Sequence, residues 1–508
     1  MSQLSPAPAE TETTSLRGGR LGVVGIVFFV LAAAAPLVGM TGALPVAIVV
    51  GNGAGVPGAY VAVGIVLLLF SVGYAAMSHR VTNAGAFFAY VGRGLGIGPG
   101  VGAAYASLLA YLTIQLAVYG FFGAVIGGKM NDEFGLDLSW WVWSLLAWVM
   151  VLLLSVLSVD VGAKVLGVLL TLELGSLVIM AVAVFAQGGG PDGIDLGASF
   201  APANVLVGGL TGSAGIALAF AFASFIGFEA TAIYGEESHD PKRTVPLATY
   251  VAVGVITVIF ALTTLAVVSA LGADTAVDEA VGRSTVDGVP LVDSAQVLFS
   301  VADEYVGSWL GTSMGWLVIS SLFAGLLAFQ NSAARYFYSM ARAGVLPHQL
   351  DRVNSAGAPA VGSAMVSVVT GAVIVVFALT DKDPVLNMFF WFSGLAVVAI
   401  VLVEVLVCAA VVVFFRRNPE GATVWKSLVA PILATVGLVL GEYLLMSRFG
   451  LLSGTVAEGV DPTTQAWGLS TLGYTLILLP FAVFAVGVVV GIARRRGENA
   501  AAIADLVS

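Results

Sequence analysis

The sequence predicts an all-α polytopic membrane protein with twelve transmembrane helices. Of its 508 residues, 59% are hydrophobic and only 10% are charged, whereas a soluble domain usually carries about 25% charged residues. The mean hydropathy is +1.02, and apolar runs of about 20 residues, each long enough to cross a bilayer as a helix, recur along the chain. This composition excludes a water-soluble enzyme and an intrinsically disordered chain.

The apolar runs define the predicted elements in order. Residues 1–20 are polar and are expected to form a disordered cytosolic tail, and residues 497–508 are expected to form a second cytosolic tail. The twelve predicted spans lie between them, near residues 23–50, 57–77, 97–127, 140–158, 165–186, 208–234, 247–271, 309–334, 361–379, 388–415, 427–447 and 467–493.

The basic residues of the loops give the expected orientation. Lys and Arg accumulate on the cytoplasmic side of membrane proteins. With the N-terminus inside, sixteen of the 20 basic residues fall on the cytoplasmic side, and only Lys129, Arg283, Lys382 and Arg448 fall outside. We therefore expect a multi-pass protein of the plasma membrane, the inner membrane of a bacterium, with both termini in the cytoplasm. The acidic outer loop at 272–308 is expected to form a lid or vestibule.

Charge and residue chemistry exclude several functions. The net charge of −10 argues against a nucleic-acid partner, which would favour a basic face. All three histidines (His79, His239 and His348) lie in predicted cytosolic loops, and the single cysteine, Cys408, lies in an apolar run. The spans show no constellation of histidines, paired aspartates or metal ligands. We therefore expect no catalytic residues, no metal and no cofactor. The expected surroundings of the protein are the lipid bilayer.

Two predicted spans contain helix-breaking residues. In the first span, Pro36 removes a backbone donor, and Gly39 and Gly42 favour non-helical dihedral angles. In the sixth span, Gly227 stands two residues before an intramembrane carboxylate, Glu229. Because one break lies in an odd-numbered span and the other in an even-numbered span, these helices cross in opposite directions. Matching interruptions in two oppositely oriented halves indicate a transporter with its site at the bilayer midplane.

Four stretches resemble motifs of the amino acid–polyamine–organocation transporters, in particular their amino-acid permeases. They are 224–229 (SFIGFE), 236–246 (EESHDPKRTVP), 331–347 with its YSMARAGVLP segment, and 83–90 (NAGAFFAY). The resemblance covers about residues 20–495. It implies a leucine-transporter-type fold, a five-plus-five inverted repeat in which helices one and six are broken. The first repeat would span 21–200 and the second 201–420, and two peripheral helices would occupy 421–496.

The breaks suggest how a zwitterion would bind. The positive end of a half-helix beginning near Met40 would suit a carboxylate, and carbonyls freed at the end of the first half of helix six would accept bonds from an ammonium group. The candidate substrate-binding residues near the breaks are Pro36, Leu37, Val38, Gly39, Met40, Ala223, Ser224, Phe225, Ile226 and Gly227. The resemblance adds Gln115 of the third span, with Tyr111 on the same helical face.

Acidic and hydroxyl side chains are candidates for gating and coupling. Glu229 is expected to act as a gate, or alternatively as a structural carboxylate. Glu173 stands where several proton-coupled relatives carry a lysine, and this departure from the family pattern bears on coupling. Because a carboxylate near the substrate can load and release a proton, we expect Glu173 to carry the coupling proton, or alternatively to bond a neighbouring helix. Glu404 and Glu442 are expected to be structural. The hydroxyls of Ser320 and Ser321 form a candidate sodium site, with helix packing as the alternative.

These observations predict a secondary active transporter of amino acids that works by alternating access, with proton symport. Its small-molecule substrate would be a neutral or modestly polar amino acid. An amine or polyamine transporter and an amino-acid exchanger remain open as alternatives, and a channel or non-transporting nutrient sensor is a more distant one. The sequence leaves the oligomeric state open.

Overall fold

The computed structural model describes residues 22–80, 86–157, 161–229, 231, 238–354, 357–419 and 422–494. Both predicted tails lie outside the described residues, as do residues 83–85, 236 and 237 of the motifs above. Within the described part of the chain, every named element is a helix. The β pairing there is limited to isolated bridges such as Gly190 with Gly193.

The helices follow the predicted apolar runs. The first half of the chain forms α1 (Val23–Ala34), α2 (Pro36–Val38), η1 (Gly39–Ala43), α3 (Leu44–Val46), η2 (Ala47–Asn52), η3 (Gly53–Gly55), α4 (Val56–Ser78), α5 (Ala86–Leu95), α6 (Ile97–Phe134), α7 (Trp140–Leu157), α8 (Val161–Ala186), α9 (Leu196–Phe200), α10 (Pro202–Val205) and η4 (Gly209–Thr211). The second half forms α11 (Ala214–Phe225), α13 (Pro241–Leu271), α14 (Ala276–Ser284), α15 (Ala295–Tyr305), α16 (Ser308–Arg342), η6 (His348–Asp351), α17 (Ala360–Leu379), η7 (Pro384–Phe389), α18 (Phe390–Arg417), η8 (Trp425–Val429), α19 (Ala430–Ser447), α20 (Phe449–Ser453) and α21 (Thr471–Arg494).

The described residues contain 10 helices long and apolar enough to cross a membrane, or up to 11 if the bent pair Pro202–Thr211 and Ala214–Phe225 forms one span. One of these helical runs, Val23–Ser78, has 56 residues, far more than the roughly 20 that one crossing needs. Gly51 interrupts it with φ −95° and ψ −107°. The chain is thus a multi-pass helical membrane protein, and the number twelve stays a prediction.

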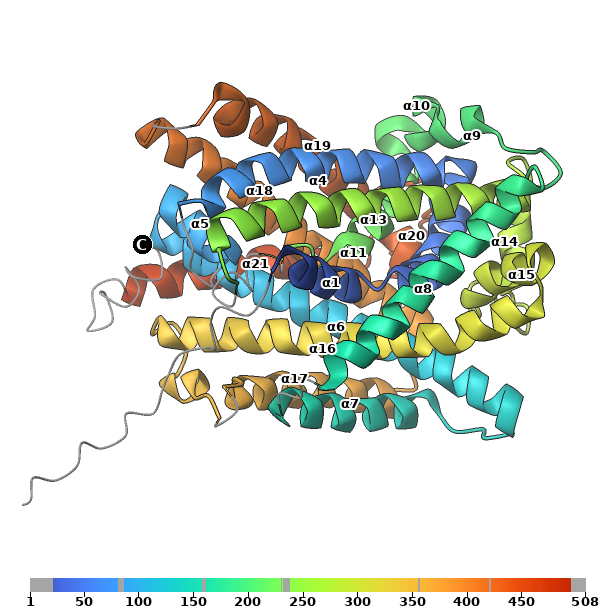
Figure 1. Ribbon diagram of the computed structural model, residues 1–508, viewed down its shortest axis with the longest axis horizontal. Helices are drawn as coiled ribbons and strands as arrows, with labels where there is room; N and C mark the ends of the chain where they lie inside the picture. Colours follow the sequence, from blue (N-terminus) through green and yellow to red (C-terminus); the bar gives the residue numbers. More distant parts are fainter. Residues whose placement is uncertain are drawn as a thin grey trace, which may run out of the picture.

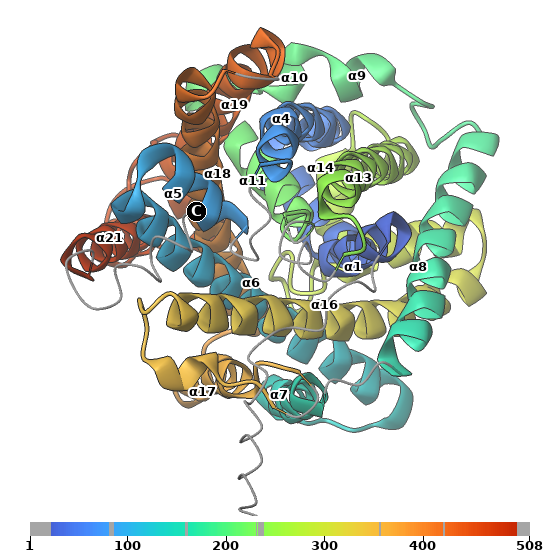
Figure 2. The same ribbon diagram turned by 60° about the vertical axis from the view of Figure 1, so that its left-hand side comes forward.

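The helices form a bundle with two short helices at its centre. Figure 2 looks obliquely along the bundle and shows α1 and α11 surrounded by α4, α13, α8, α16, α6 and α18. Helices α7 and α17 pack together outside α16, while α19 and α21 lie at the periphery. The two central helices are those in which the sequence predicts breaks.

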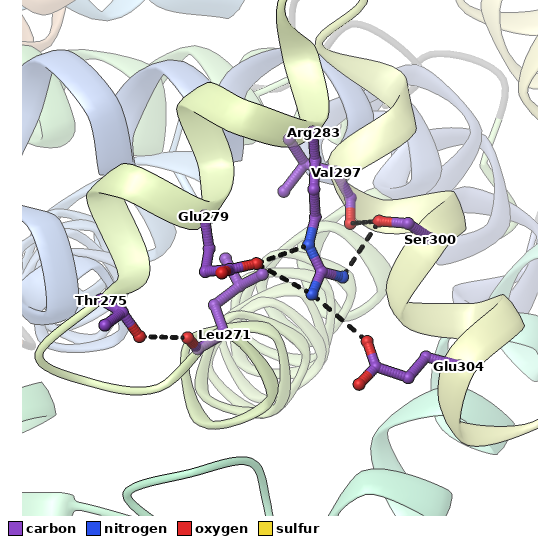
Figure 3. A network of polar contacts seen from close by, with 7 residues as sticks. All are labelled: Leu271, Thr275, Glu279, Arg283, Val297, Ser300 and Glu304. Carbon is purple, nitrogen blue, oxygen red and sulfur yellow. Dashed lines mark hydrogen bonds and ion pairs between the residues drawn. The ribbon is translucent and has the colours of Figure 1, made fainter.

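One end of the bundle is covered by α14 and α15, on the right of Figure 1. Arg283 of α14 connects the two helices (Figure 3): its guanidinium bonds Glu279 at 3.2 Å, Glu304 at 3.3 Å and the Ser300 hydroxyl at 3.1 Å. Partly exposed ion pairs of this kind contribute little stability. Their effect is to fix the orientation of α14 against α15 at this end.

Helix α21 packs closely on α6 through facing glycines. Gly98 and Gly102 are four residues apart on α6, and Gly487 and Gly491 are four apart on α21. A Cβ atom at Gly487 would lie 2.8 Å from the Gly102 Cα, and one at Gly491 would lie 3.3 Å from the Gly98 Cα. Paired small residues of this type let membrane helices approach until their backbones touch.

We therefore expect Gly487→Leu to destabilise the protein strongly. The added side chain has no space without separating the two backbones, and overpacking of this kind typically costs about 1–3 kcal/mol. Thermal unfolding of the detergent-purified protein measures the loss. Gly175→Leu on α8 is the matched control, because a Cβ atom there meets nothing within 4 Å. Equal melting temperatures for the two variants would contradict the close α6–α21 contact.

Candidate functional site

The first helix breaks at Ala35. This residue adopts a left-handed conformation (φ 42°, ψ 69°) and ends α1, and Pro36 begins the next helical segment. Proline suits this first position because it has no N–H to satisfy there. The helix therefore restarts at Pro36, and residues 36–43 are helical. The sequence-based expectation of a restart near Met40 is wrong.

This break leaves carbonyl groups, not N–H groups, for a ligand. The Val38 and Gly39 N–H groups both bond the Ala35 carbonyl, at 2.9 and 3.1 Å, and the Leu37 N–H bonds a side chain. The carbonyls of Ala33 and Ala34 thereby lose the N–H donors that a continuous helix would give them. The expected free N–H groups for a carboxylate are thus occupied.

The side chain that holds Leu37 is Glu173 of α8. Its Oε1 atom accepts the Leu37 N–H at 2.6 Å and the Ser321 hydroxyl of α16 at 2.9 Å. Glu173 is 3% exposed. One buried carboxylate therefore connects the helix-one break to two surrounding helices.

The two predicted coupling sites are one site in space. A cavity of about 10 Å³ is lined by Glu173, Ser320 and Ser321, with Ala32 on the break side. This is near the smallest volume that holds one water molecule or an ion of that size. Ser320 itself donates to the Leu317 carbonyl at 2.8 Å, so only Ser321 contacts the carboxylate.

The sixth span breaks at Ile226 and Gly227, directly after α11. The Ile226 N–H bonds the Ala223 carbonyl at 3.1 Å, and the Phe228 N–H bonds the Phe225 carbonyl at 3.1 Å. A continuous helix would use the Phe222 and Ser224 carbonyls instead. Gly227 has φ +112°, a conformation that only glycine adopts readily. The predicted break and its freed carbonyls are therefore present.

Glu229 stabilises this second break. Its Oε2 atom accepts the Gly227 N–H at 2.9 Å, and its Oε1 atom accepts the Tyr111 hydroxyl at 2.6 Å. The Tyr74 hydroxyl donates to the Glu229 carbonyl at 3.0 Å. Glu229 is fully buried, so its carboxylate is engaged within the protein in this conformation.

A small cavity lies between the two breaks. Its volume is about 50 Å³, and apolar side chains and alanines dominate its walls. Two hydroxyls reach it: Ser224, which bonds Phe220 O and the Tyr60 hydroxyl, and Ser393 of α18. The Ser393 hydroxyl is buried and has no hydrogen-bond partner among the described residues. Beside the freed backbone carbonyls, the cavity thus offers one unpartnered hydroxyl in apolar surroundings.

The structure places only part of the predicted substrate set on this cavity. Val38, Gly39, Ala223 and Ser224 line it, whereas Pro36, Leu37, Met40, Phe225, Ile226 and Gly227 do not. On α6, Ile114 and Val118 line it in place of Tyr111 and Gln115. Sequence reasoning also missed Ala33, Ala34, Ala35, Ala43, Phe220, Gly325, Phe329, Phe389 and Ser393.

Gln115 and Tyr111 form hydrogen bonds to other side chains of the helical bundle and do not line the cavity. The Gln115 amide donates to Gln330 at 2.8 Å, and Gln330 in turn bonds the Ser363 carbonyl at 2.8 Å and the Ser367 hydroxyl at 3.0 Å. The Tyr111 hydroxyl donates a hydrogen bond to the Glu229 carboxylate. A register change of one residue along α6 separates these polar side chains from the cavity-lining face, and the sequence alone does not fix that register.

A second, larger cavity lies at the α14–α15 end. It measures about 470 Å³, and its charged lining consists of Asp132, Asp293, Asp303, Asp383 and a single lysine, Lys129. Burial raises the pKa of Asp293, and the nearby Asp132 carboxylate raises it further. The excess of carboxylates gives this cavity a negative potential.

An aromatic pair separates the two cavities. Phe121 of α6 lines the larger cavity and Phe389 lines the smaller one, and their rings stack with centroids 4.9 Å apart. Phe220 adds a third ring, 6.2 Å from Phe389. Phe389 is 5% exposed, so its ring is buried within the protein.

A helical membrane bundle with a small central cavity between two helix breaks has the architecture of a membrane transporter. The amino acid permease family model matches residues 21–479, and the chain belongs to this family.

Two other proteins are similar to this chain. An uncharacterized transporter of Legionella pneumophila is 27% identical over 219 residues, which is 42% of this chain and 44% of that protein. The chain therefore aligns with less than half the length of this curated relative. The structure of a Na⁺-coupled sialic acid symporter in a substrate-bound outward-open state matches with a TM-score of 0.49 and 13% identity, over 89% of this chain and 92% of that chain.

We expect Gly227→Ala to weaken substrate binding by about tenfold or more. The alanine would be strained at φ +112°, and its Cβ atom would lie 2.7 Å from the Ala33 Cβ of the first break; strain of this kind costs about 1–3 kcal/mol. Concentration-dependent uptake of radiolabelled amino acids into proteoliposomes measures the change in KM. Gly254→Ala on α13 is the control, because its Cβ atom meets nothing within 4 Å. A Gly227→Ala protein with unchanged KM would refute the role of this turn.

Proposed function

We propose that this permease is a secondary active transporter that moves neutral amino acids across the plasma membrane by alternating access, with proton symport. Transport, without an enzymatic activity, is the whole of the proposed function. The proposed orientation follows the loop charges, with both termini in the cytoplasm and the α14–α15 end outside. The single observation that carries the proposal is the central cavity bounded by both helix breaks.

The chemistry of this cavity supports a small neutral substrate. Freed backbone carbonyls at both breaks suit an ammonium group, and the Ser393 hydroxyl suits a carboxylate as a hydrogen-bond donor. Val38, Ile114 and Val118 would surround the side chain, and an apolar wall favours an apolar group over a charged one. No charged side chain of the described residues lines the cavity, so a dianionic or dicationic substrate is disfavoured.

Glu173 supports proton coupling through the first break. As an anion it accepts two hydrogen bonds on one oxygen, from Leu37 and Ser321, and hydrogen bonds to a charged acceptor are the stronger kind. A proton on this carboxylate would weaken both bonds. Loading from outside would thus release the helix that carries Val38 and Gly39 at the substrate cavity, which couples proton binding to movement of the site.

The stacked Phe121 and Phe389 rings support a gate on the outer side. They stand between the proposed substrate cavity and the acidic outer cavity. Gly42 approaches both rings, since a Cβ atom there would lie 3.0 Å from Phe389 and 3.1 Å from Phe121. Movement of the first broken helix would therefore move this gate.

One observation favours a second candidate, a transporter of amines. Four aspartates against one lysine line the outer cavity, and this potential would concentrate cations near the gate. The apolar inner cavity then has to accept the amine, so a competition assay with putrescine decides between the two substrates.

We expect Glu173→Gln to abolish concentrative uptake driven by an inward proton gradient. Glutamine keeps the size and the acceptor oxygen but cannot exchange a proton at neutral pH. The measurement is uptake of a radiolabelled amino-acid panel plus putrescine into proteoliposomes, with and without the gradient. Ser321→Ala should lower gradient-driven uptake about tenfold or more, because a hydrogen bond to a charged group contributes about 1.5–3 kcal/mol.

Ser320→Ala is the matched control for Ser321→Ala, because Ser320 bonds only backbone on its own helix. Uptake that is independent of the proton gradient but requires a sodium gradient would identify sodium, not the proton, as the coupling ion at the same cavity. Uptake that ignores both gradients but accelerates with internal substrate would make the protein an exchanger.

We expect Ser393→Ala to raise the KM several-fold while leaving folding intact. The hydroxyl has no partner to lose in the protein, and a hydrogen bond to a ligand contributes about 0.5–1.5 kcal/mol. Concentration-dependent uptake gives the KM, and Ser313→Ala, on the exposed surface of α16, is the control. An unchanged KM would place the substrate elsewhere.

A further inference from the structure

A third cavity lies on the side of the bundle, apart from the cavity between the two helix breaks. It is enclosed by α6, α7, α8 and α16, and its volume is about 620 Å³, within the range of cavities that hold small organic ligands. None of the described residues that line it is charged, and the Ser320 hydroxyl in its wall already bonds the Leu317 carbonyl. This lateral cavity is therefore suited to an apolar occupant.

Two matching stripes of side chains form the long walls of the lateral cavity. Both stripes have the same helical spacing and begin with a tryptophan: Trp143, Leu146, Ala147, Met150 and Leu154 on α7, and Trp316, Ile319, Ser320, Phe323 and Leu327 on α16. Such spacing places each set on one face of its helix. Helices α7 and α16 lie side by side and run in the same direction from the α14–α15 end (Figures 1 and 2). Both tryptophans therefore lie at the same end of the cavity.

The lateral cavity is as deep as one leaflet of a bilayer. Eleven positions separate Trp143 from Leu154 and Trp316 from Leu327, which corresponds to about 16 Å along a helix. The hydrocarbon core of a bilayer is about 30 Å thick, and tryptophans are enriched where it meets the headgroups. The cavity thus extends from the interface to about the middle of the bilayer, which is the depth that one lipid acyl chain occupies.

The mouth of the lateral cavity is continuous with the lipid-facing surface of the protein. Leu146 and Met150 are 52% and 54% exposed, whereas Ala147 in the same stripe is 2% exposed. Val149 and Leu153, which do not line the cavity, are also exposed on α7. Exposed apolar side chains of a membrane-spanning helix face the hydrocarbon. Ala147 therefore belongs to the floor of the cavity, and an acyl chain can enter sideways from the bilayer.

A hydrogen-bond donor at the tryptophan end of the cavity has no acceptor. Trp143 lines the cavity, and its indole N–H is buried without a hydrogen-bond partner among the described residues. An unpaired buried donor is costly, and indole can only donate. The ester carbonyls of a phospholipid lie directly above its acyl chains and supply an acceptor at this level. This favours a phospholipid over an occupant without oxygen atoms.

We propose that the lateral cavity binds one acyl chain of a phospholipid, with an ester carbonyl at Trp143 and the chain end near Leu154 and Leu327. Leu169 and Ser320 line both this cavity and the small cavity at Glu173. The bound chain therefore lies against the wall of the Glu173 cavity. Binding does not depend on transport, and only the assignment of this leaflet as the outer one rests on the proposed function.

The test is native mass spectrometry of the whole protein, reconstituted in palmitoyl-oleoyl-phosphatidylcholine and extracted into detergent. We expect the wild type to retain one phospholipid more than Met150→Trp, because the larger ring would fill the middle of the cavity from a position that is already half exposed. Val149→Trp is the matched control. It adds the same ring at an exposed position of α7 that does not line the cavity, and it should retain lipid as the wild type does.

A second variant tests the tryptophan end of the site. Trp143→Phe keeps an aromatic ring but removes the N–H group, so the affinity of the delipidated protein for added palmitoyl-oleoyl-phosphatidylcholine should fall several-fold. Trp141→Phe, at an exposed residue outside the cavity, is the control and should leave the affinity unchanged. Equal affinities for the two variants would contradict the position assigned to the ester carbonyl.

Three results would overturn the lipid site. Equal retention by Met150→Trp and Val149→Trp would place the bound lipid elsewhere on the protein. A retained molecule with the mass of the detergent or of a free fatty acid would identify a different occupant, and a wild-type protein that retains no lipid would mean that the cavity is not a binding site. These measurements need no uptake, so a failure of the lipid site is distinguishable from a failure of the proposed transport function.

Discussion

Inside a bilayer every backbone polar group has to find its partner within the protein, and this constraint governs the centre of the molecule. Breaking a helix at Ala35 or at Gly227 frees N–H groups that water cannot satisfy at that depth. In both places a buried carboxylate takes one of them: Glu173 bonds Leu37 N–H, and Glu229 bonds Gly227 N–H. The two acids allow irregular backbone at the centre of an otherwise regular helical bundle. The central cavity exists because these breaks are stable.

The same constraint explains the selectivity that the cavity can have. Between the breaks lie alanines, valine, isoleucine and phenylalanine, with two hydroxyls and the freed carbonyls. In the proposed transporter, backbone groups would recognise the part of a substrate that all amino acids share, whereas the side-chain walls would discriminate by size and polarity. At about 50 Å³ the cavity in this conformation favours small side chains. In the proposed transport cycle the acidic outer cavity would act earlier, by attracting cations, and the stacked Phe121 and Phe389 would separate the two steps.

The sequence predicted the helical membrane class because long apolar runs leave no other folded solution in a bilayer. It also predicted both breaks, since Pro36 lacks an N–H and Gly227 tolerates positive φ. It placed the restart of helix one near Met40, whereas Ala35 makes the turn and Pro36 begins the next helix. The sequence placed the cavity-lining face of α6 one residue away from its position in the structure: Ile114 and Val118 line the cavity, and Gln115 bonds Gln330. Ser393 was missed because a serine in an apolar helix gives no signal until its lack of a partner is visible.

In the proposed mechanism, the hydrogen-bond partners of the two central acids favour one of them as the group that couples ion binding to movement. Glu229 bonds an N–H only two residues earlier in the chain, so this bond travels with its own segment; Tyr111 is its contact with the bundle. Glu173 belongs to α8 and holds both the first broken helix and Ser321 of α16. Its charge state therefore alters a contact between three separate elements. A proton on Glu229 would change the stability of one turn, whereas a proton on Glu173 would change how a moving helix is held by its surroundings.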